Sequence, residues 1–432
     1  MKFIELHDIG YGECIVFEGK SNEVMMIDCG SMNLNIKYNG MKFKDYVLKI
    51  IMPRYEDASQ KNFLLTHFHR DHICGLKYIL KQEKSYFDKI YIPYPCVNNE
   101  NRALLLEMAI YLFVFMIRQQ SSARSSTSAL FIFDFLRKNS TAQILPIKKG
   151  DFFEFSGVKY TILNPNYKKF EFSKEFIEII KSLDNMMESI NENNYDNRFF
   201  YLKKLFCDEY INCCELCAKY KSLENDYVKN SIYKLNSLVI KLNELSNEIK
   251  ELNATREIIK FLNSEYVNMT YSMEQNATSV VFQNDKQNLT NCNDIIMTGD
   301  VTPKILDSLE NELFKFYNII KVPHHGTDSY QSMVLNKIPC SHLLVSNGEY
   351  CAGGRISKLI SENNAIKHCT DMKNCHYFKK NNSCCNRTNF CNSLKIGGDL
   401  SLHCDKKTNS TGINKCGIYI VSADSNRGCY CD

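Results

Sequence analysis

The chain has 432 residues, of which 44% are hydrophobic and 24% are charged, so it can bury one large core with insertions or two cores of ordinary size. Its formal net charge of +4 is too small to indicate nucleic-acid binding by itself, because phosphate recognition usually concentrates Lys and Arg on one face. The N-terminus lacks the basic start, apolar run and cleavage site of a secretory signal. We therefore expect a globular, cytoplasmic protein whose 20 cysteines are free thiols or metal ligands rather than disulfides.

The first 165 residues alternate strand and helix patterns. Short apolar runs separated by turns from residue 3 to 28 predict β-hairpins. A further strand at 62–66 runs into a histidine cluster, and a helix is expected at 73–80. The most apolar stretch, 103–117, contains Glu107 and is shorter than the roughly 20 residues that span a bilayer. It predicts a buried helix and no membrane segment, and strand patterns resume at 150–155 and 158–163.

A helical insertion is expected over 166–275. From 167 to 271 the chain is rich in Lys, Glu and Asn and contains no His, Gly or Pro, which favours long helices over sheet. Apolar residues recur every seven positions in two series, Val228, Leu235, Leu242 and Ile249 in one and Leu238, Leu245 and Leu252 in the other. This seam is typical of a helical hairpin that packs on itself, and a dimerising coiled coil or a site for a protein partner is the alternative.

Strand patterns return at 279–282, 294–297, 319–322 and 342–345. We therefore interpret 1–165 and 276–432 as one discontinuous α/β domain that the insertion interrupts. The segment 367–416 within it is rich in Cys and His, but its spacings match no regular zinc motif. Buried or surface thiols are the favoured interpretation of this segment, with a structural zinc site as the alternative.

Metal-binding chemistry is concentrated between Thr66 and His72. His67 and His69 stand two apart at the end of an apolar strand, so in an extended conformation both imidazoles point the same way and can share one ion. Asp71 and His72 then face the position of a neighbouring ion. These N and O donors suit zinc, with manganese or iron possible where a carboxylate joins the imidazoles. Because the whole chain has only ten His, chance clustering is a poor explanation.

Later strand ends supply the remaining ligands of a two-metal site. Asp300 directly follows the strand pattern at 294–297, and His324 and His325 follow the one at 319–322. A carboxylate such as Asp300 can bridge two ions, which together lower the pKa of a shared water.

Together, the motif from His67 to His72, the strand-end Asp300 and the later His pair resemble the metallo-β-lactamase superfamily. Segments 7–14, 26–30, 276–281 and 322–326 are similar to the hydrolase domain of ComEC-type DNA-uptake proteins, a match over about 1–165 and 276–360. The resemblance implies an αββα sandwich, here with the long helical insertion, that binds two divalent metal ions at one edge. It also implies an activity on phosphodiesters, nucleic acids included.

The resemblance also implies a role for each matching residue. His67 and His69 hold one ion, Asp71, His72 and His325 hold the other, and Asp300 bridges them. Asp71 and His324 are the catalytic candidates, with His324 as a phosphate contact. The remaining candidates support ligands or contact substrate: Asp28, which would orient a ligand imidazole, Asn276, Ser279 and Arg355.

One departure from the pattern concerns the first ion. Many enzymes of the superfamily supply a further His before the bridging Asp, but no His lies between His72 and His324. The site then binds its first ion weakly, uses a Cys, Asn or Asp in place of the imidazole, or retains only one ion. The leading hypothesis is a phosphodiesterase or nuclease in which a metal-bound hydroxide attacks phosphorus. Alternatives are a hydrolase of thioesters, lactones or lactams, or a binding or scaffold protein with a degenerate metal site.

Overall fold

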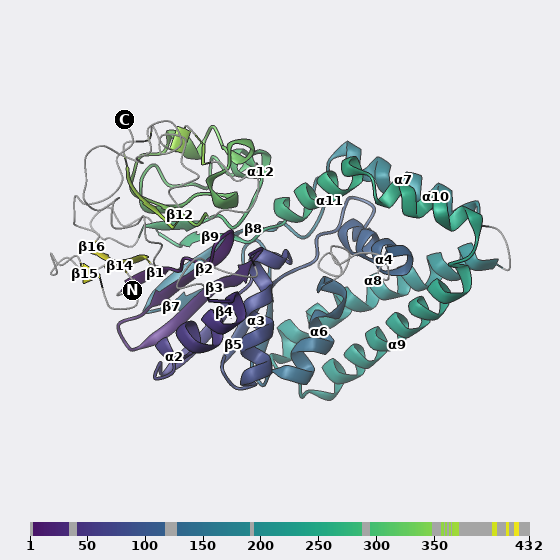
Figure 1. Ribbon diagram of the computed structural model, residues 1–432, viewed down its shortest axis with the longest axis horizontal. Helices are drawn as coiled ribbons and strands as arrows, with labels where there is room; N and C mark the ends of the chain where they lie inside the picture. The colour runs from purple at the N-terminus through teal and green to yellow at the C-terminus, as the bar shows by residue number, and fades with distance from the viewer. Residues whose placement is uncertain are drawn as a thin grey trace.

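The computed structural model describes residues 3–33, 41–116, 128–190, 194–286 and 294–347, together with 356–357, 359–360, 363, 365–370, 400–403, 412–413 and 419–422. Two mixed β-sheets lie at one end of the molecule and a body of long helices lies at the other (Figure 1). The protein is therefore a mixed α/β structure, as the sequence predicts.

The first sheet begins with antiparallel hairpins and continues in parallel strands. Its described strands lie in the order β15, β16, β14, β1, β2, β3, β4, β5, β6. The first three strands of the chain pair antiparallel, as the alternating apolar runs predict, whereas β3 to β6 pair parallel. The strands are β1 Phe3–Leu6, β2 Gly12–Glu18, β3 Glu23–Ser31, β4 Gln60–Leu64, β5 Lys89–Pro93, β6 Gln143–Ile147, β14 Leu400–His403, β15 Gly412–Ile413 and β16 Tyr419–Ser422.

The second sheet is built from both sides of the helical insertion. Its described strands lie in the order β13, β12, β11, β10, β9, β8, β7. The strand before the insertion, β8, pairs antiparallel with the strand after it, β9, while β10 to β13 pair parallel. The strands are β7 Phe152–Phe155, β8 Val158–Asn164, β9 Val281–Asn284, β10 Ile295–Met297, β11 Tyr317–Lys321, β12 Cys340–Val345 and β13 Ile366–Cys369.

The two sheets pack face to face over a shared apolar core. Phe17 of the first sheet lies with its ring centroid 6.2 Å from Phe155, 6.3 Å from Tyr160 and 6.4 Å from Phe282 of the second. Buried apolar residues of both sheets form one continuous cluster. Burial of this kind is the main favourable term in folding. It also fixes the ends of the two sheets relative to each other, and the polar site described below lies at those ends.

Three helices cover the outer face of the first sheet, where they pack on apolar residues that point away from the shared core. They are α1 Phe43–Tyr46, α2 Met52–Arg54 and α3 Arg70–Gln82. The short helix α12, Pro303–Ser308, follows β10 and lies against the second sheet (Figure 1). The structure therefore has helices next to both sheets.

The helical body contains more of the chain than the predicted insertion. It comprises α7 Lys174–Glu188, α8 Tyr195–Tyr220, α9 Asp226–Ile249, α10 Asn253–Leu262 and α11 Glu265–Ala277, together with α4 Leu104–Met116 and α6 Ser128–Asn139. Helix α4 contacts α7, α8, α9, α10 and α11, and nearly all of its side chains are buried. The prediction of a buried apolar helix is confirmed, and that helix lies at the centre of the body.

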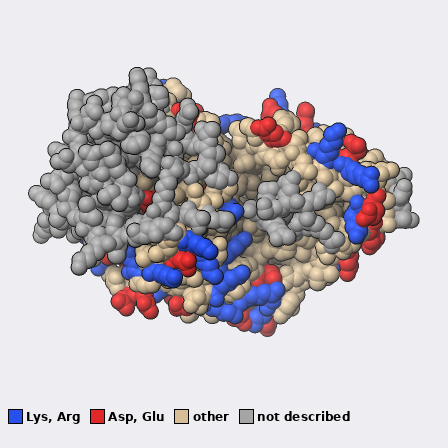
Figure 2. All heavy atoms as spheres, viewed as in Figure 1, with Lys and Arg blue, Asp and Glu red and all other residues tan. Residues whose placement is uncertain are grey.

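The predicted hairpin is formed by α8 and α9, which lie side by side (Figure 1). The seam residues Val228, Leu235, Leu242 and Ile249 are buried within the chain, against α8, α4 and α6. Among the described residues, no helix combines the length and the apolar character needed to cross a membrane. On the face that Figure 2 shows, Lys and Arg gather below the junction of the sheets and the helical body, with Asp and Glu beside them.

Candidate metal centre

The histidine motif lies where the first sheet is followed by helix α3. The loop after β4 leads into this helix, whose first turn contains Asp71 and His72. A carboxylate in the first turn is stabilised by the positive end of the helix macrodipole. Gly30 of β3 permits the close approach of the helix, since a Cβ at that position would lie 2.4 Å from the backbone nitrogen of His72.

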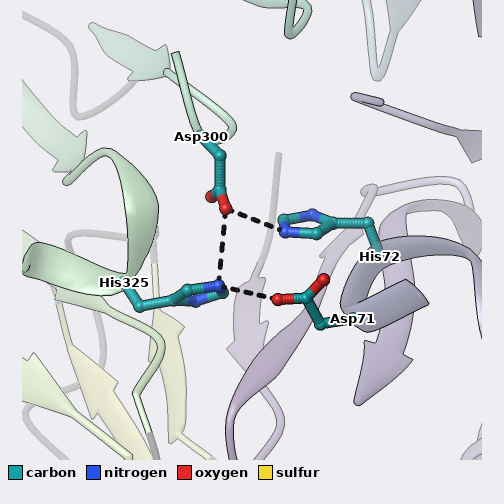
Figure 3. Close-up of side chains that lie close together, drawn as sticks. All are labelled: Asp71, His72, Asp300 and His325. Atoms are coloured by element: carbon teal, nitrogen blue, oxygen red, sulfur yellow. Dashed lines mark hydrogen bonds and ion pairs between the residues drawn. The ribbon is translucent and has the colours of Figure 1, made fainter. Parts of the chain in front are cut away.

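Two further residues reach the same place from the second sheet. Asp300 follows β10 and His325 follows β11, and these two strands are parallel neighbours. The carboxyl ends of parallel strands meet at one edge of a sheet, which is a common location for ligand sites in α/β proteins. Asp71, His72, Asp300 and His325 therefore converge although they are far apart in the sequence (Figure 3).

The spacing of these four side chains fits a metal ion. All four are buried, and one ligand atom from each lies within 4.8 Å of the others. His72 Nε2 is 3.2 Å from Asp300 Oδ2, and His325 Nε2 is 3.5 Å from that oxygen and 3.4 Å from Asp71 Oδ2 (Figure 3). Two ligands bonded at about 2.0 to 2.1 Å to a tetrahedral zinc ion lie roughly 3.3 to 3.4 Å apart. The observed separations are those of ligands around one ion.

Both imidazoles of the cluster are oriented by a second hydrogen bond. His72 Nδ1 donates to Asp28 Oδ2 at 2.7 Å, and His325 Nδ1 donates to the backbone oxygen of Ser346 at 2.8 Å. In each ring Nε2 is left facing the cluster, which is the usual arrangement of a metal-binding histidine. Asp28 also accepts hydrogen bonds from the backbone nitrogen and the hydroxyl of Thr66, at 2.7 and 2.6 Å. It therefore holds the His72 ring with Nε2 toward the cluster.

A buried ion pair supports the carboxylate of Asp300. Lys321, the last residue of β11, forms an ion pair with Glu13 of β2 and lies 3.6 Å from Asp300 Oδ1. Burial lowers the pKa of Lys321, but attraction to Glu13 and Asp300 outweighs burial and raises the pKa above its ordinary value. The sequence reasoning missed both Lys321 and Glu13. The available signal was a charged residue inside each of two apolar strands.

Burial and neighbouring charges shift the pKa values of the site residues in different directions. Burial, together with the imidazoles of His72 and His69, holds the pKa of His67 well below its ordinary range. Burial raises the pKa of Asp71, but the hydrogen bond to His325 and the charge of His72 outweigh it and bring the pKa to about 2. Burial lowers the pKa of His72, but attraction to Asp300 and Asp28 outweighs burial and holds the pKa well above its ordinary range. His67 and Asp71 are therefore in the states that bind metals at neutral pH, whereas an ion must displace a proton from His72.

Two predicted ligand atoms are buried without a hydrogen bond. Among the described residues, these are His67 Nε2 and Asp300 Oδ1, of which Asp300 Oδ1 also lies 3.6 Å from Lys321 Nζ. An unsatisfied buried polar group costs about 1–3 kcal/mol, so such atoms are uncommon in folded proteins. A bound cation would give both atoms a partner. The residues present therefore fit a metal ion.

Three residues of this region have a strained backbone conformation. Asp28, His324 and His325 have positive φ values of 54°, 45° and 57°, in the left-handed region that residues other than glycine rarely adopt. Strain of this kind costs about 1–3 kcal/mol per residue and tends to occur at functional sites. Here the strained residues are Asp28, which orients a ligand, and the candidate site residues His324 and His325.

The His67 and His69 half of the predicted centre is less complete. Their ring centroids are 4.6 Å apart, so the two side chains point the same way, as predicted. No third His, Cys, Asp or Glu of the described residues joins them in a common group. Instead, Oε1 of Gln275 in α11 lies 3.0 Å from His69 Nε2. Gln275 was not predicted, because one amide on a polar helix carries no distinguishing pattern.

His324 lies beside the cluster and is only partly buried. Its ring stacks on Tyr330, with centroids 3.8 Å apart and an angle of 12°, and its Nδ1 is 2.6 Å from the hydroxyl of Thr327. Asn276 donates from Nδ2 to the hydroxyl of Tyr330 at 2.7 Å. Asn276 is buried and contacts the tyrosine on which His324 stacks.

The other candidates have separate outcomes. Ser279 is buried, and its hydroxyl accepts a hydrogen bond from the backbone nitrogen of Asp300 at 3.3 Å, so it positions the bridging candidate. Arg355 lies outside the described residues. So does most of the Cys-rich segment, of which 367–370, 400–403 and 412–413 are described, so the choice between free thiols and a structural zinc site stays open there.

Comparison with known proteins adds no assignment to this geometry. No protein-family model matches the chain, and no curated protein matches it significantly.

Proposed function

We propose that the protein is a metal-dependent hydrolase of phosphodiesters, nucleic acids among them. The observation that carries the proposal is the buried cluster of Asp71, His72, Asp300 and His325, whose ligand atoms converge from two sheets. The facing sheets and the resemblance of the His motif support a metallo-β-lactamase αββα sandwich as the fold.

The residues present divide between two ions. Asp71, His72 and His325 would hold one, His67 and His69 would contribute to the other, and Asp300 would be available to both. Zinc and manganese both suit this mixture of imidazole and carboxylate. Divalent ions bound here would lower the pKa of a water molecule and stabilise charge on the phosphoryl oxygens.

His324 is suited to move a proton during the reaction. The hydroxyl of Thr327 donates to the backbone oxygen of His324 at 3.1 Å, so it accepts from the ring at Nδ1 and leaves a lone pair on Nε2. Burial lowers the pKa of His324 to about 4, so the ring is neutral at neutral pH. Neutral His324 can accept a proton at Nε2, and the protonated ring can contact a phosphate oxygen.

Cleavage assays with matched aspartate variants test the proposal. Protein loaded with manganese or zinc is incubated with single-stranded DNA, RNA and bis(p-nitrophenyl) phosphate. We expect cleavage of at least one, abolished in Asp300→Asn. The control is Asp294→Asn, because Asp294 is equally buried, at 1% exposure, directly before β10, where it accepts from Asn284 at 2.9 Å. Failure of the metal-loaded protein to cleave any of these substrates overturns the proposal.

An apolar pocket supports hydrolysis of a thioester, lactone or lactam as a second candidate. The pocket lies beside His67 and holds about 50 Å³, enough for a small apolar group. Its walls come from both the sheet region and the helical body and include Phe68, Tyr94, Leu105, Tyr210 and Tyr271. Cleavage of a panel of acyl substrates, without cleavage of phosphodiesters, would favour this candidate.

A further inference from the structure

The helical insertion reaches the metal centre through the last turn of α11. Gln275 lies in that turn, is 8% exposed, and points its Oε1 at His69 Nε2 over 3.0 Å. His67, the neighbour of His69, has a buried Nε2 without a hydrogen-bond partner. His67 and Gln275 also line the same small pocket. His69 therefore lies next to both other side chains, with its ring centroid 4.6 Å from that of His67 and its Nε2 3.0 Å from Gln275 Oε1.

The backbone around Gln275 is held in place from both sides. The preceding Glu274 accepts a hydrogen bond from the backbone nitrogen of Ser173, just before α7, at 3.0 Å. The hydroxyl of Thr278 donates to the backbone oxygen of Gln275 at 2.9 Å. These bonds fix the backbone that carries the Gln275 side chain, and a metal ligand needs such support.

The separation of the two atoms is that of neighbouring ligands on an ion. For an octahedral ion with bonds of about 2.1 Å, adjacent ligands lie roughly 3.0 Å apart, which matches His69 Nε2 and Gln275 Oε1. An amide oxygen is a harder and weaker donor than an imidazole. It favours manganese over zinc in this position.

We propose that Gln275 is the third protein ligand of the first ion, beside His67 and His69, in place of the histidine that the sequence lacks. The inference rests on the proposed metal centre and extends it to the insertion. The two sites then differ in affinity. The site formed by His67, His69 and Gln275 binds its ion more weakly than the site formed by Asp71, His72 and His325. The helical insertion is then also part of the metal centre.

Metal titration without any activity assay tests this inference. Manganese binding to the full chain is measured by electron paramagnetic resonance of free Mn²⁺, for the wild type and for Gln275→Leu. The control is Gln283→Leu, since Gln283 is also a buried glutamine, at 5% exposure, but hydrogen-bonds the backbone of Glu312 on the second sheet. We expect two ions in the wild type and the control, with affinity for the weaker one lowered at least about tenfold in Gln275→Leu.

A second variant keeps the test decisive if the leucine disturbs folding. Gln275→Glu has nearly the same shape and adds a charged oxygen, so it should bind the weaker ion at least about tenfold more tightly. Unchanged binding of the weaker ion in both variants overturns the inference, as does a wild type that binds only one ion. A wild type that binds no ion contradicts the metal centre itself, and with it the proposed function.

Discussion

Replacing Lys321 by Met is expected to destabilise the protein strongly. The side chain is fully buried, at 0% exposure, and forms ion pairs with Glu13 and, at 3.6 Å, with Asp300. Burial raises the pKa of Glu13 even with Lys321 present, so the substitution leaves a buried carboxyl group that must take up a proton or stay charged without its cation. Removing one partner of a buried ion pair costs about 3–5 kcal/mol. We expect the free energy of unfolding to fall by about that amount.

Removing the charges of both Lys321 and Glu13 should lower the free energy of unfolding by much less than the sum of the two single substitutions. Urea unfolding of the wild type, Lys321→Met, Glu13→Gln and the double variant gives the coupling free energy between the two positions. The measurements are made with a chelator present, so that metal binding does not add to stability. We expect a coupling of at least about 1.5 kcal/mol. Losses that add to within about 0.5 kcal/mol would refute the reasoning.

Three further predictions concern ligand orientation, core packing and pH. Asp28→Asn should weaken metal binding by about 10- to 100-fold in a metal titration, because the imidazole it orients loses its charged acceptor. Leu242→Ala, at 0% exposure, should cost about 2–5 kcal/mol in urea unfolding, and Ile240→Ala, at 58% exposure on the same helix, about 0.5 kcal/mol or less. Burial raises the pKa of Asp184, but Lys203 outweighs it, so the pKa lies below 3.8. The ionised Asp184 therefore stabilises the fold above pH 3.8, and this contribution is lost as the pH falls and the carboxylate is protonated. In acid unfolding, the free energy of unfolding should fall more steeply with pH in the wild type than in Asp184→Asn. Equal slopes would contradict the prediction.

The parts of the fold with a strong local pattern could be predicted from the sequence. Three kinds of local pattern indicate which residues are buried: the alternating apolar runs of β2 and β3, the apolar composition of α4, and the heptads of α9. Each pattern is complete within a short stretch of the sequence. Strands β5 and β6 were not predicted, because they lie among helices and carry only short apolar runs. Their position in the sheet is set by pairing with distant strands, which a local pattern does not encode.

The candidate site divides in the same way. The spacing of His67, His69, Asp71 and His72 marks the centre directly, since metal ligands close in sequence leave a motif. Gln275 is different, because its contact with His69 depends on how the insertion packs against the sheet region. Only the three-dimensional structure could have identified it.

The central claim is that Asp71, His72, Asp300 and His325 hold a metal ion. Elemental analysis of the purified protein, after equilibration with zinc and manganese and removal of free metal, tests it most directly. We expect bound metal in the wild type and in Asp294→Asn, and loss of the ion held by the cluster in Asp300→Asn. A wild type without bound metal, or Asp300→Asn with the full wild-type content, would contradict it.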